Sequence, residues 1–535
     1  MSDQPNFLMF ITDQHRADHL GCYGNEIVQT PNIDGIAAKG TKFEKFYVAC
    51  PICMPNRATL MTGRMPSLHG VRQNGIPLPL NTTTFTEILL AAGYQTALFG
   101  KSHLQCISAN PVEVGLPSPD PTKFQPPTEL AESMRGIWEN GDYEQELPPT
   151  WKDKPNFEPG LPFYGFNELA LAIGHSDRVT GHYARWLAER HPDPDSLRGP
   201  DNALASNRKL NAPQAWRTAI PEELYPTTYV AEKTIDFIKS QTSSDKTKPF
   251  FVQCSFPDPH HPFTPPGKYF DMYDPADIPT PEAFHHPKEL LPPNVAALHK
   301  ERDLGKANKN GQRGFGCTEQ EAREAIALNY GSISMIDDAI GRVLTALDET
   351  GKADNTIVIF TTDHGDFMGD HQLLLKAAIH YQGLIRVPCI WSDPKTNHGG
   401  TSSSAFTGTI DLASSFLDRA GIQEFNGMQG LSLGQIAAGA PGHDSMVIEE
   451  SQRRGYMGFQ PNFRARSLVA DHWRLTLYSD TDWGELYNLA NDPNEFENLW
   501  DDPGYQRIRT ELLERLTRRM MDLSDSSPLS IGHGP

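Results

Sequence analysis

The sequence predicts an α/β protein in which helices flank a large, mostly parallel central sheet, and a smaller C-terminal domain adds an antiparallel sheet. Short, continuous apolar runs at 7–12 and 356–361 are typical of buried parallel strands. Segments with helical periodicity alternate with such runs along the chain, which is the pattern of a parallel sheet with crossover helices. The segment 466–478 resembles a β-hairpin instead, so it predicts the second, antiparallel sheet.

The predicted helices carry start signals, stop signals or apolar periodicity. The first has Pro31 at its first position and Gly40 at its end. The longest, 319–351, places apolar residues such as Ile333 and Ile336 three or four positions apart. The remaining helices are expected at 85–92, 229–241, 410–420 and 504–523, and the remaining strands at 95–99, 249–256 and 386–392.

These elements predict a large domain over 1–445 and a C-terminal antiparallel subdomain with a closing helix over 446–523. Two stretches of the large domain, 106–225 and 257–318, are rich in Pro and lack clear periodicity. We interpret both as lid-like excursions over one face, because loops of this length in a compact domain are usually functional. The last residues, 524–535, are interpreted as a tail or an oligomer arm.

Composition limits the classes of partner. The chain has 535 residues with 47 Lys and Arg against 67 Asp and Glu, a formal net charge of −20. Such a charge argues against nucleic acid and anionic membranes as partners, and an anionic substrate would need local positive charge. No run of 18 apolar residues predicts a membrane span, and the apolar run near the N-terminus is too short for a secretory signal. The seven scattered cysteines are typical of a reducing compartment, so we expect a cytoplasmic protein.

The segment Cys53-Met-Pro55-Asn-Arg57 is the most informative motif. Pro55 suits the first turn of a helix and Gly63 its end, so Cys53 is expected at a helix N-terminus, a position that favours a thiolate or a bound anion. Two other interpretations remain at this point: a buried structural cysteine, or a redox or half-zinc pair formed with Cys50. Neither of them requires Pro55 or Arg57.

The C-x-P-x-R segment, followed by Thr-Gly-Arg, resembles the signature of the formylglycine-dependent sulfatases of the alkaline phosphatase superfamily. Similar pieces follow in the family's order at 93–104, 255–262, 362–366 and 485–493. Within the family, the arylsulfatase, phosphonate monoester hydrolase and choline sulfatase branches are the most similar. The resemblance implies that Cys53 is oxidised to formylglycine (3-oxoalanine) by a formylglycine-generating enzyme.

The resemblance also implies one divalent metal ion. Acidic residues after a strand are often only helix caps, but the carboxyl ends of parallel strands are also where α/β sheets place their sites. Gln14 and His364 stand where many sulfatases have Asp and Asn, which shifts the expected metal from Ca²⁺ toward Mn²⁺, Mg²⁺ or Zn²⁺. We expect Mn²⁺ or Ca²⁺, with Mg²⁺ and Zn²⁺ as alternatives. The implied ligands are Asp13, Gln14, Cys53, Asp363 and His364.

Cationic and polar residues are implied to surround the transferred group, although each alone could be a surface or structural residue. In the implied mechanism the formylglycine hydrate attacks the ester, His260 with Lys376 protonates the leaving oxygen, and His103 accepts the proton that releases sulfate. The implied catalytic residues are Cys53, Arg57, Lys101, His103, His260 and Lys376, and the implied substrate contacts are Asn74, Lys101, His260 and Lys376.

The sequence therefore predicts a sulfuric ester hydrolase that acts on a small aryl or alkyl sulfate. The alternative is a phosphonate monoester or phosphodiester hydrolase with the same site and promiscuous sulfatase activity; the pair Lys101 and His103 favours the sulfatase. A third, less favoured hypothesis is a non-enzymatic metal or redox protein that uses Cys50 and Cys53. The resemblance further implies a homo-oligomer, either a dimer or a tetramer.

Overall fold

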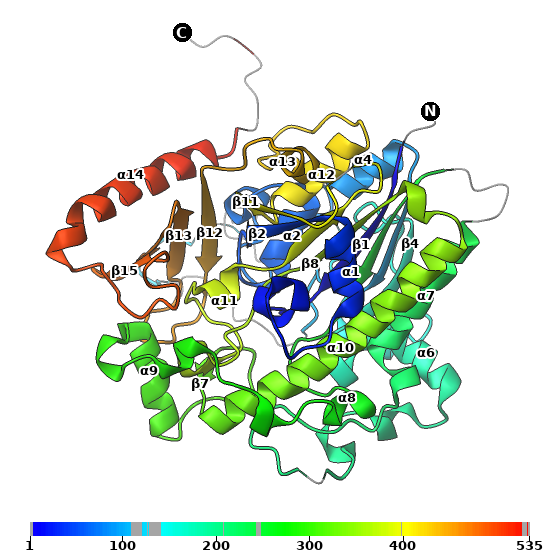
Figure 1. The fold of residues 1–535 in the computed structure, drawn as a ribbon, viewed down its shortest axis with the longest axis horizontal. Helices are drawn as coiled ribbons and strands as arrows, with labels where there is room; N and C mark the ends of the chain where they lie inside the picture. The colour runs from blue at the N-terminus through cyan, green and yellow to red at the C-terminus, as the bar shows by residue number, and fades with distance from the viewer. Residues whose placement is uncertain are drawn as a thin grey trace.

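A nine-stranded sheet forms the centre of the computed structural model (Figure 1). The structure describes residues 4–526 except 109–119, 126, 128–140, 207, 242–247 and 397, together with residue 532. The strands, in spatial order, are β11 (Thr401–Gly408), β2 (Thr41–Tyr47), β10 (Cys389–Ser392), β8 (Thr356–Thr362), β1 (Asn6–Thr12), β6 (Phe250–Ser255), β3 (Gln95–Gly100), β4 (Glu168–Ile173) and β5 (Thr180–Gly181). Strands β8, β1, β6, β3 and β4 run parallel, whereas β10 and β5 are antiparallel to their neighbours. The predicted mostly parallel sheet is confirmed.

The central strand β1 is buried on both faces. Phe7 and Met9 belong to one hydrophobic cluster, and Leu8 and Phe10 belong to another. Because successive side chains of a strand point to opposite faces, the two clusters lie on opposite sides of the sheet. The continuous apolar run in the sequence is therefore explained by burial on both sides.

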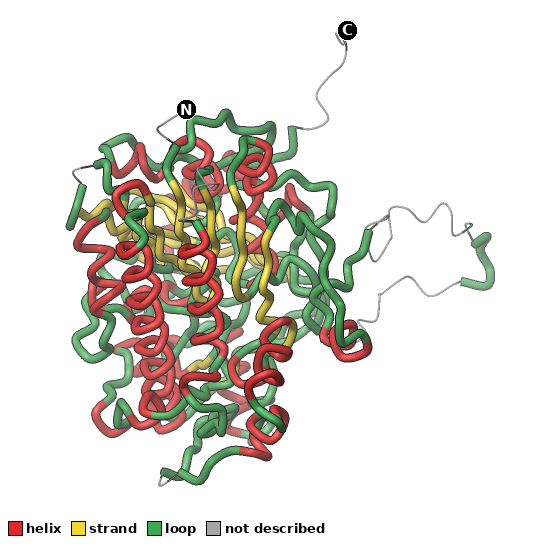
Figure 2. Tube along the Cα trace, turned by 90° about the vertical axis from the view of Figure 1, so that its right-hand side faces the viewer, coloured by secondary structure: helices red, strands yellow, loops and turns green. Residues whose placement is uncertain are grey.

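Helices cover both faces of the sheet (Figure 2). One cluster is completed by α1 (Pro31–Lys39), α6 (His182–Arg190), α7 (Pro226–Ser240) and α10 (Glu319–Glu349), and the other by α2 (Cys53–Thr62), α4 (Phe85–Ala91) and α12 (Asp411–Arg419). The shorter elements are α3 (Pro66–His69), α5 (Pro148–Asp153), α8 (Lys268–Asp271), α9 (Pro293–Asp303), α11 (Gln382–Ile385), α13 (Leu433–Ala437), and the strand pair β7 (Phe315–Gly316) and β9 (Leu373–Leu374).

A second, four-stranded antiparallel sheet follows near the C-terminus, as predicted. It consists of β12 (Ser445–Ser451), β13 (Arg464–Ala470), β14 (Trp473–Tyr478) and β15 (Gly484–Asn488). The amphipathic helix α14 (Gln506–Asp522) buries Leu512 and Leu516. These two leucines and the inward side chains of the small sheet belong to the same cluster as Phe7, so the two sheets share one hydrophobic core.

One expectation about the chain's organisation is wrong. The stretch 106–225 is not irregular throughout, because it contains β4, which pairs with β3 in the central sheet, and the helix α6. Most of the tail expected at 524–535 lies outside the described residues, as does part of the first excursion. None of the helices in the described ranges combines the length and the apolar character that crossing a membrane requires.

Candidate active site

Three of the predicted metal ligands lie at the carboxyl ends of two neighbouring parallel strands. Asp13 follows β1, and Asp363 and His364 follow β8. The register pairs Thr12 with Thr362, so the residues that follow are brought side by side although 350 positions separate them in the chain. All three side chains are fully buried.

Cys53 enters this group from the first turn of α2. Its Sγ lies 3.0 Å from Nε2 of His364, 3.3 Å from Nζ of Lys376 and 3.8 Å from Oδ1 of Asp13. The helix starts at Cys53, as predicted, and the exposed Asn74 accepts a hydrogen bond from the Met54 N–H at 3.1 Å. In this structure Asn74 therefore caps the helix that carries Cys53.

Four of the donors form a compact group that suits a metal ion. The carboxylates of Asp13 and Asp363, the imidazole of His364 and the sulfur of Cys53 offer ligand atoms that all lie within 4.8 Å of one another. Two carboxylates and an imidazole, all buried, fit a divalent cation. Gln14 lies beside this group, with its Oε1 accepting a hydrogen bond from Lys376 Nζ at 3.0 Å.

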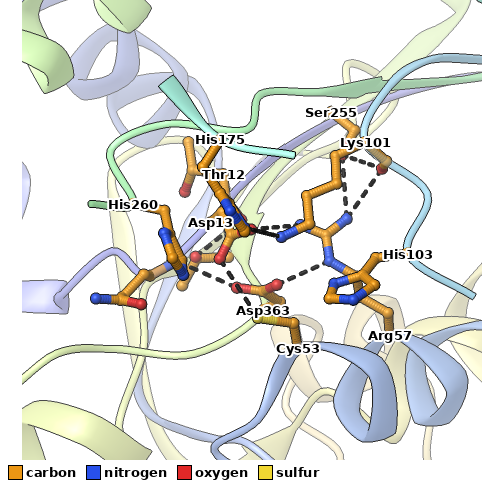
Figure 3. A network of polar contacts seen from close by, with 12 residues as sticks. Thr12, Asp13, Cys53, Arg57, Lys101, His103, His175, Ser255, His260 and Asp363 are labelled. Atoms are coloured by element: carbon orange, nitrogen blue, oxygen red, sulfur yellow. Dashed lines mark hydrogen bonds and ion pairs between the residues drawn. The ribbon is translucent and has the colours of Figure 1, made fainter. Parts of the chain in front are cut away.

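Arg57 connects the donor group to the neighbouring strands (Figure 3). Its Nε donates to Oδ2 of Asp363 at 2.7 Å, and its Nη1 donates to the Lys101 carbonyl at 3.0 Å and to the Ser255 hydroxyl at 3.2 Å. Its buried Nη2 makes no hydrogen bond within the described residues. An unsatisfied, buried guanidinium nitrogen is suited to a substrate oxygen, because an anion supplies the missing acceptor.

Lys101 is held by two acceptors. Its Nζ donates to Oδ2 of Asp13 and lies 2.7 Å from Nε2 of His175. Asp13, His175 and His260 form a second group of close donor atoms. The ammonium of Lys101 already contacts two members of this second group, Asp13 and His175.

His175 is a site residue that the sequence analysis missed. Its ring stacks on that of His260, with 3.6 Å between centroids and 11° between planes. The hydroxyl of the next residue, Ser176, donates to the His260 carbonyl at 3.0 Å. The available signal was a histidine soon after the strand-like run that became β4, at the same edge of the sheet as Lys101.

His260 and Lys376 face each other across the site. Nζ of Lys376 lies 3.2 Å from Nε2 of His260, and Nδ1 of His260 lies 2.5 Å from the His261 carbonyl. This contact assigns the ring proton to Nδ1 and leaves Nε2 directed at the ammonium. The two side chains can therefore share a proton at a single place in the site.

His103 lies on the Arg57 side of the group (Figure 3). Its backbone N–H donates to the buried Glu146 carboxylate at 2.7 Å, and its φ of 59° is left-handed. Its Nδ1 is buried and makes no hydrogen bond within the described chain. This imidazole is free to accept a proton from a group bound beside Cys53.

The electrostatics of the site favour a negative charge at Cys53. Burial and the Asp13 carboxylate oppose ionisation, but the cations of Lys376 and Lys101 and the nearby His364 hold the Cys53 pKa below its ordinary value. Burial also holds the pKa of His260 well below its ordinary value, helped by neighbouring imidazoles and Lys376. The site thus combines fixed cations with a His260 ring whose neutral form is favoured by burial.

The structure brings together all the predicted catalytic residues and metal ligands, while Asn74 lies at the edge of the group. Cys50 is buried and is a free thiol, as is Cys53. Fold and site define an α/β enzyme whose buried donors suit a metal ion and whose cations suit an anionic substrate.

Comparisons with known proteins agree with this class. The family model described as Sulfatase matches residues 5–422, and the model described as N-sulphoglucosamine sulphohydrolase, C-terminal, matches residues 369–522. The chain therefore belongs to the sulfatase family, within the alkaline phosphatase superfamily, and is a sulfatase.

Two curated relatives span nearly the whole chain. An arylsulfatase of Clostridium perfringens is 29% identical over 99% of this chain and 98% of its own length. A multifunctional alkaline phosphatase superfamily protein of Trinickia caryophylli is 28% identical over 94% of this chain and 92% of its own. Among solved structures, the phosphonate monoester hydrolase of Agrobacterium radiobacter has a similar fold, with a TM-score of 0.75, 24% identity and coverage of 98% and 97% of the two chains.

Proposed function

We propose that this sulfatase hydrolyses sulfate esters of small aryl or alkyl alcohols, with Cys53 converted to formylglycine as the nucleophile. The observation that carries the proposal is the position of the Cys53 side chain, which lies within 3.3 Å of both Lys376 and His364 in a buried group of cations and metal-type donors. A group oxidised to an aldehyde at this point would meet a transferred sulfuryl group among fixed positive charges.

The metal would be held by Asp13, Asp363, His364 and the side chain at position 53, with Gln14 beside them. When bound, it supplies positive charge that favours the ionised form of a nucleophilic hydroxyl and offsets charge on the sulfate oxygens. We favour Mn²⁺ or Ca²⁺, and Mg²⁺ or Zn²⁺ are the alternatives.

Metal removal provides a prediction of its own. A chelator is expected to lower the Tm, because the cation binds buried donors that exist only in the folded state. Differential scanning fluorimetry before and after chelation measures the change, and elemental analysis of the untreated protein identifies the ion. An unchanged Tm together with a metal-free preparation would contradict the metal site.

The protein's own side chains account for binding and proton transfer. Nη2 of Arg57 makes no hydrogen bond within the described residues and lies 3.8 Å from Oδ2 of Asp13. This nitrogen and the ammonium of Lys101 would bind non-bridging sulfate oxygens, which carry the charge that develops during transfer. His260, in contact with Lys376, would donate the proton to the leaving oxygen. The unpartnered Nδ1 of His103 would accept the proton whose loss releases sulfate.

Mass spectrometry of the tryptic peptide 46–57 tests the nucleophile. We expect an aldehyde at Cys53, trapped by a hydrazine, in protein produced together with a formylglycine-generating enzyme, and hydrolysis of an aryl sulfate that rises with the converted fraction. Cys53→Ala should remove activity, whereas the control Cys50→Ala should keep the modification because it leaves the C-x-P-x-R segment intact. Full activity of a preparation with two unmodified thiols would contradict the proposal.

The second candidate substrate class is a phosphonate monoester or phosphodiester. It is favoured by the similarity of the fold to a phosphonate monoester hydrolase. Comparison of kcat/KM for an aryl sulfate and an aryl phosphonate on one preparation separates the two. We expect the sulfate to be preferred, because in this proposal Lys101 and His103 both act on the transferred group. A clear preference for the phosphonate would reverse this order.

A further inference from the structure

Arg313 has no acidic partner among the described residues, and its loop is hydrogen-bonded to the segment that carries Lys376. Its guanidinium carbon lies 4.6 Å from the centre of the Tyr456 ring, and both side chains are half-buried. No carboxylate pairs with Arg313 among the ion pairs of the described residues, whereas Lys309 in the same loop contacts Glu321. In a chain with a net charge of −20, an unpaired arginine stacked on an aromatic ring is available for an anion.

The loop of Arg313 is attached to the segment that carries Lys376. The N–H of Gly314 donates to the Lys376 carbonyl at 2.6 Å. The Tyr456 hydroxyl accepts a hydrogen bond from the Ala378 N–H at 3.0 Å. The Arg313 loop and the Tyr456 side chain therefore both contact the 376–378 segment, from which the Lys376 ammonium reaches the reacting centre.

The same loop is also attached to the segment that carries His260. The side-chain amide of Gln214 donates to the carbonyls of Lys309 at 3.1 Å and Gly311 at 2.9 Å. The Gln214 carbonyl accepts from the N–H of Phe263, three residues after His260. The loop thus lies between the segment that carries Lys376 and the segment that carries His260, the two residues proposed to protonate the leaving oxygen.

We propose that Arg313 and Tyr456 form a binding subsite for the leaving alcohol, and that the preferred alcohols carry an anion of their own, a carboxylate or a second sulfate. This proposal rests on the proposed function, because it assigns the leaving group to the side of His260 and Lys376. The guanidinium offers two parallel N–H groups to a carboxylate or sulfate, and the tyrosine face packs against a ring or an apolar stem. The half-buried setting strengthens the contact relative to an exposed one.

Three aryl sulfates test the subsite: those of 4-hydroxybenzoate and of its methyl ester, and hydroquinone disulfate. We expect the wild type to prefer the two esters whose alcohol carries an anion. Arg313→Gln should reduce that preference, measured as a ratio of kcat/KM values, by about 10- to 100-fold, because a hydrogen-bonded charge pair contributes about 1.5–3 kcal/mol. Comparing this ratio between the variant and the wild type cancels differences in the intrinsic reactivity of the three esters. The first and third esters separate carboxylate from sulfate recognition.

Arg342→Gln is the matched control. Arg342 is exposed on α10, near the residues that line a separate cavity at the opposite end of the strands, and its loss removes the same charge. The control should keep the wild-type ratio, and Arg313→Lys should restore part of the preference. An equal loss for charged and uncharged esters in Arg313→Gln, or the same change in Arg342→Gln, would overturn the subsite.

Calorimetric titration with 4-hydroxybenzoate, the released alcohol, decides the proposal without turnover. We expect binding by the wild type that is weakened at least tenfold in Arg313→Gln. If no sulfate ester is hydrolysed, the proposed function fails while this titration still reports on the subsite. Equal binding by the two proteins, or none by the wild type, would overturn the subsite even if sulfatase activity is present.

Discussion

At the level of single residues, the most informative side chain is His175. Its Nε2 accepts a hydrogen bond from the Lys101 ammonium, and its ring stacks on that of His260. His175 therefore contacts both a charge-binding group and the expected proton donor. The two contacts of His175 can be tested separately, because each depends on a different property of the ring.

Two substitutions separate the contacts of His175. His175→Gln keeps an acceptor for Lys101 but loses the ring, whereas His175→Phe keeps a ring against His260 but loses the acceptor. We expect His175→Phe to lower kcat/KM about tenfold, the effect of one lost charged hydrogen bond, and to do so equally for good and poor leaving groups.

The leaving-group dependence supplies the readout. If stacking positions His260 for protonation, His175→Gln should affect esters with poor leaving groups more than those with good ones, because only the former need the proton. Rates measured with a series of aryl sulfates give this slope for both variants. Identical slopes in the two variants and the wild type would limit His175 to the Lys101 contact.

The residues of the site could be predicted where a local motif holds them together. Cys53 and Arg57 lie in one helix, and Lys101 and His103 lie in one turn. Residues that are close in the chain form a recognisable motif, so their roles could be predicted. His175 lacks such a neighbour, since its role depends on contacts with residues distant in the chain. Whether Arg313 has an acidic partner likewise depends on which residues the fold places beside it, and the sequence does not show this.

At the level of elements, the turn that follows β3 depends on one buried carboxylate. Glu146 accepts hydrogen bonds from three consecutive backbone N–H groups, those of His103 at 2.7 Å, Leu104 at 2.9 Å and Gln105 at 2.7 Å. These three hydrogen bonds fix a turn in which His103 has a left-handed conformation that most residues avoid.

Glu146→Gln should therefore destabilise the protein and misplace His103. The amide has one oxygen in place of two, so at least one buried N–H group loses its acceptor, at a cost of about 1–3 kcal/mol. Thermal unfolding and kcat on an aryl sulfate should both decrease. Glu144→Gln, at an exposed position in the same segment, is the control; equal behaviour of the two variants would show that the carboxylate does not hold the turn.

The elements themselves were predictable in most places because burial on two faces leaves a clear pattern. The strands β1 and β8 are continuous apolar runs, and α10 has unbroken helical periodicity. β4 was missed because proline-rich segments surround it. Strand order was not predictable either, and it is strand order that places Asp13 beside Asp363.

At the level of the whole molecule, the acidic surface and the cationic centre are complementary. The net charge of −20 requires that an anion be bound by local positive groups, and the structure places Arg57, Lys101 and Lys376 together, all of them buried. Several histidines are buried as well, like these cations. Many are buried as neutral rings, so the molecule as a whole should be sensitive to acid.

His69, which is distant from the metal-type donors in the chain, allows this sensitivity to be measured. Its Nε2 lies 3.1 Å from the Thr59 hydroxyl, and its Nδ1 accepts a hydrogen bond from the Val71 N–H, which requires a neutral ring. Burial, with a smaller contribution from Arg64, lowers the pKa of His69 from 6.5 to about 3. Between these two values the unfolded chain binds the proton and the folded chain does not.

The stability contributed by this difference is present above pH 6.5 and is lost as the pH falls toward 3, by about 1.4 kcal/mol per pH unit for one histidine. His69→Gln should therefore lower stability at neutral pH but flatten its decline below pH 6.5. Denaturant unfolding at a series of pH values measures the slope, with the exposed His472→Gln as the control. A slope in His69→Gln as steep as that of the wild type would show that this ring is not neutral in the folded protein.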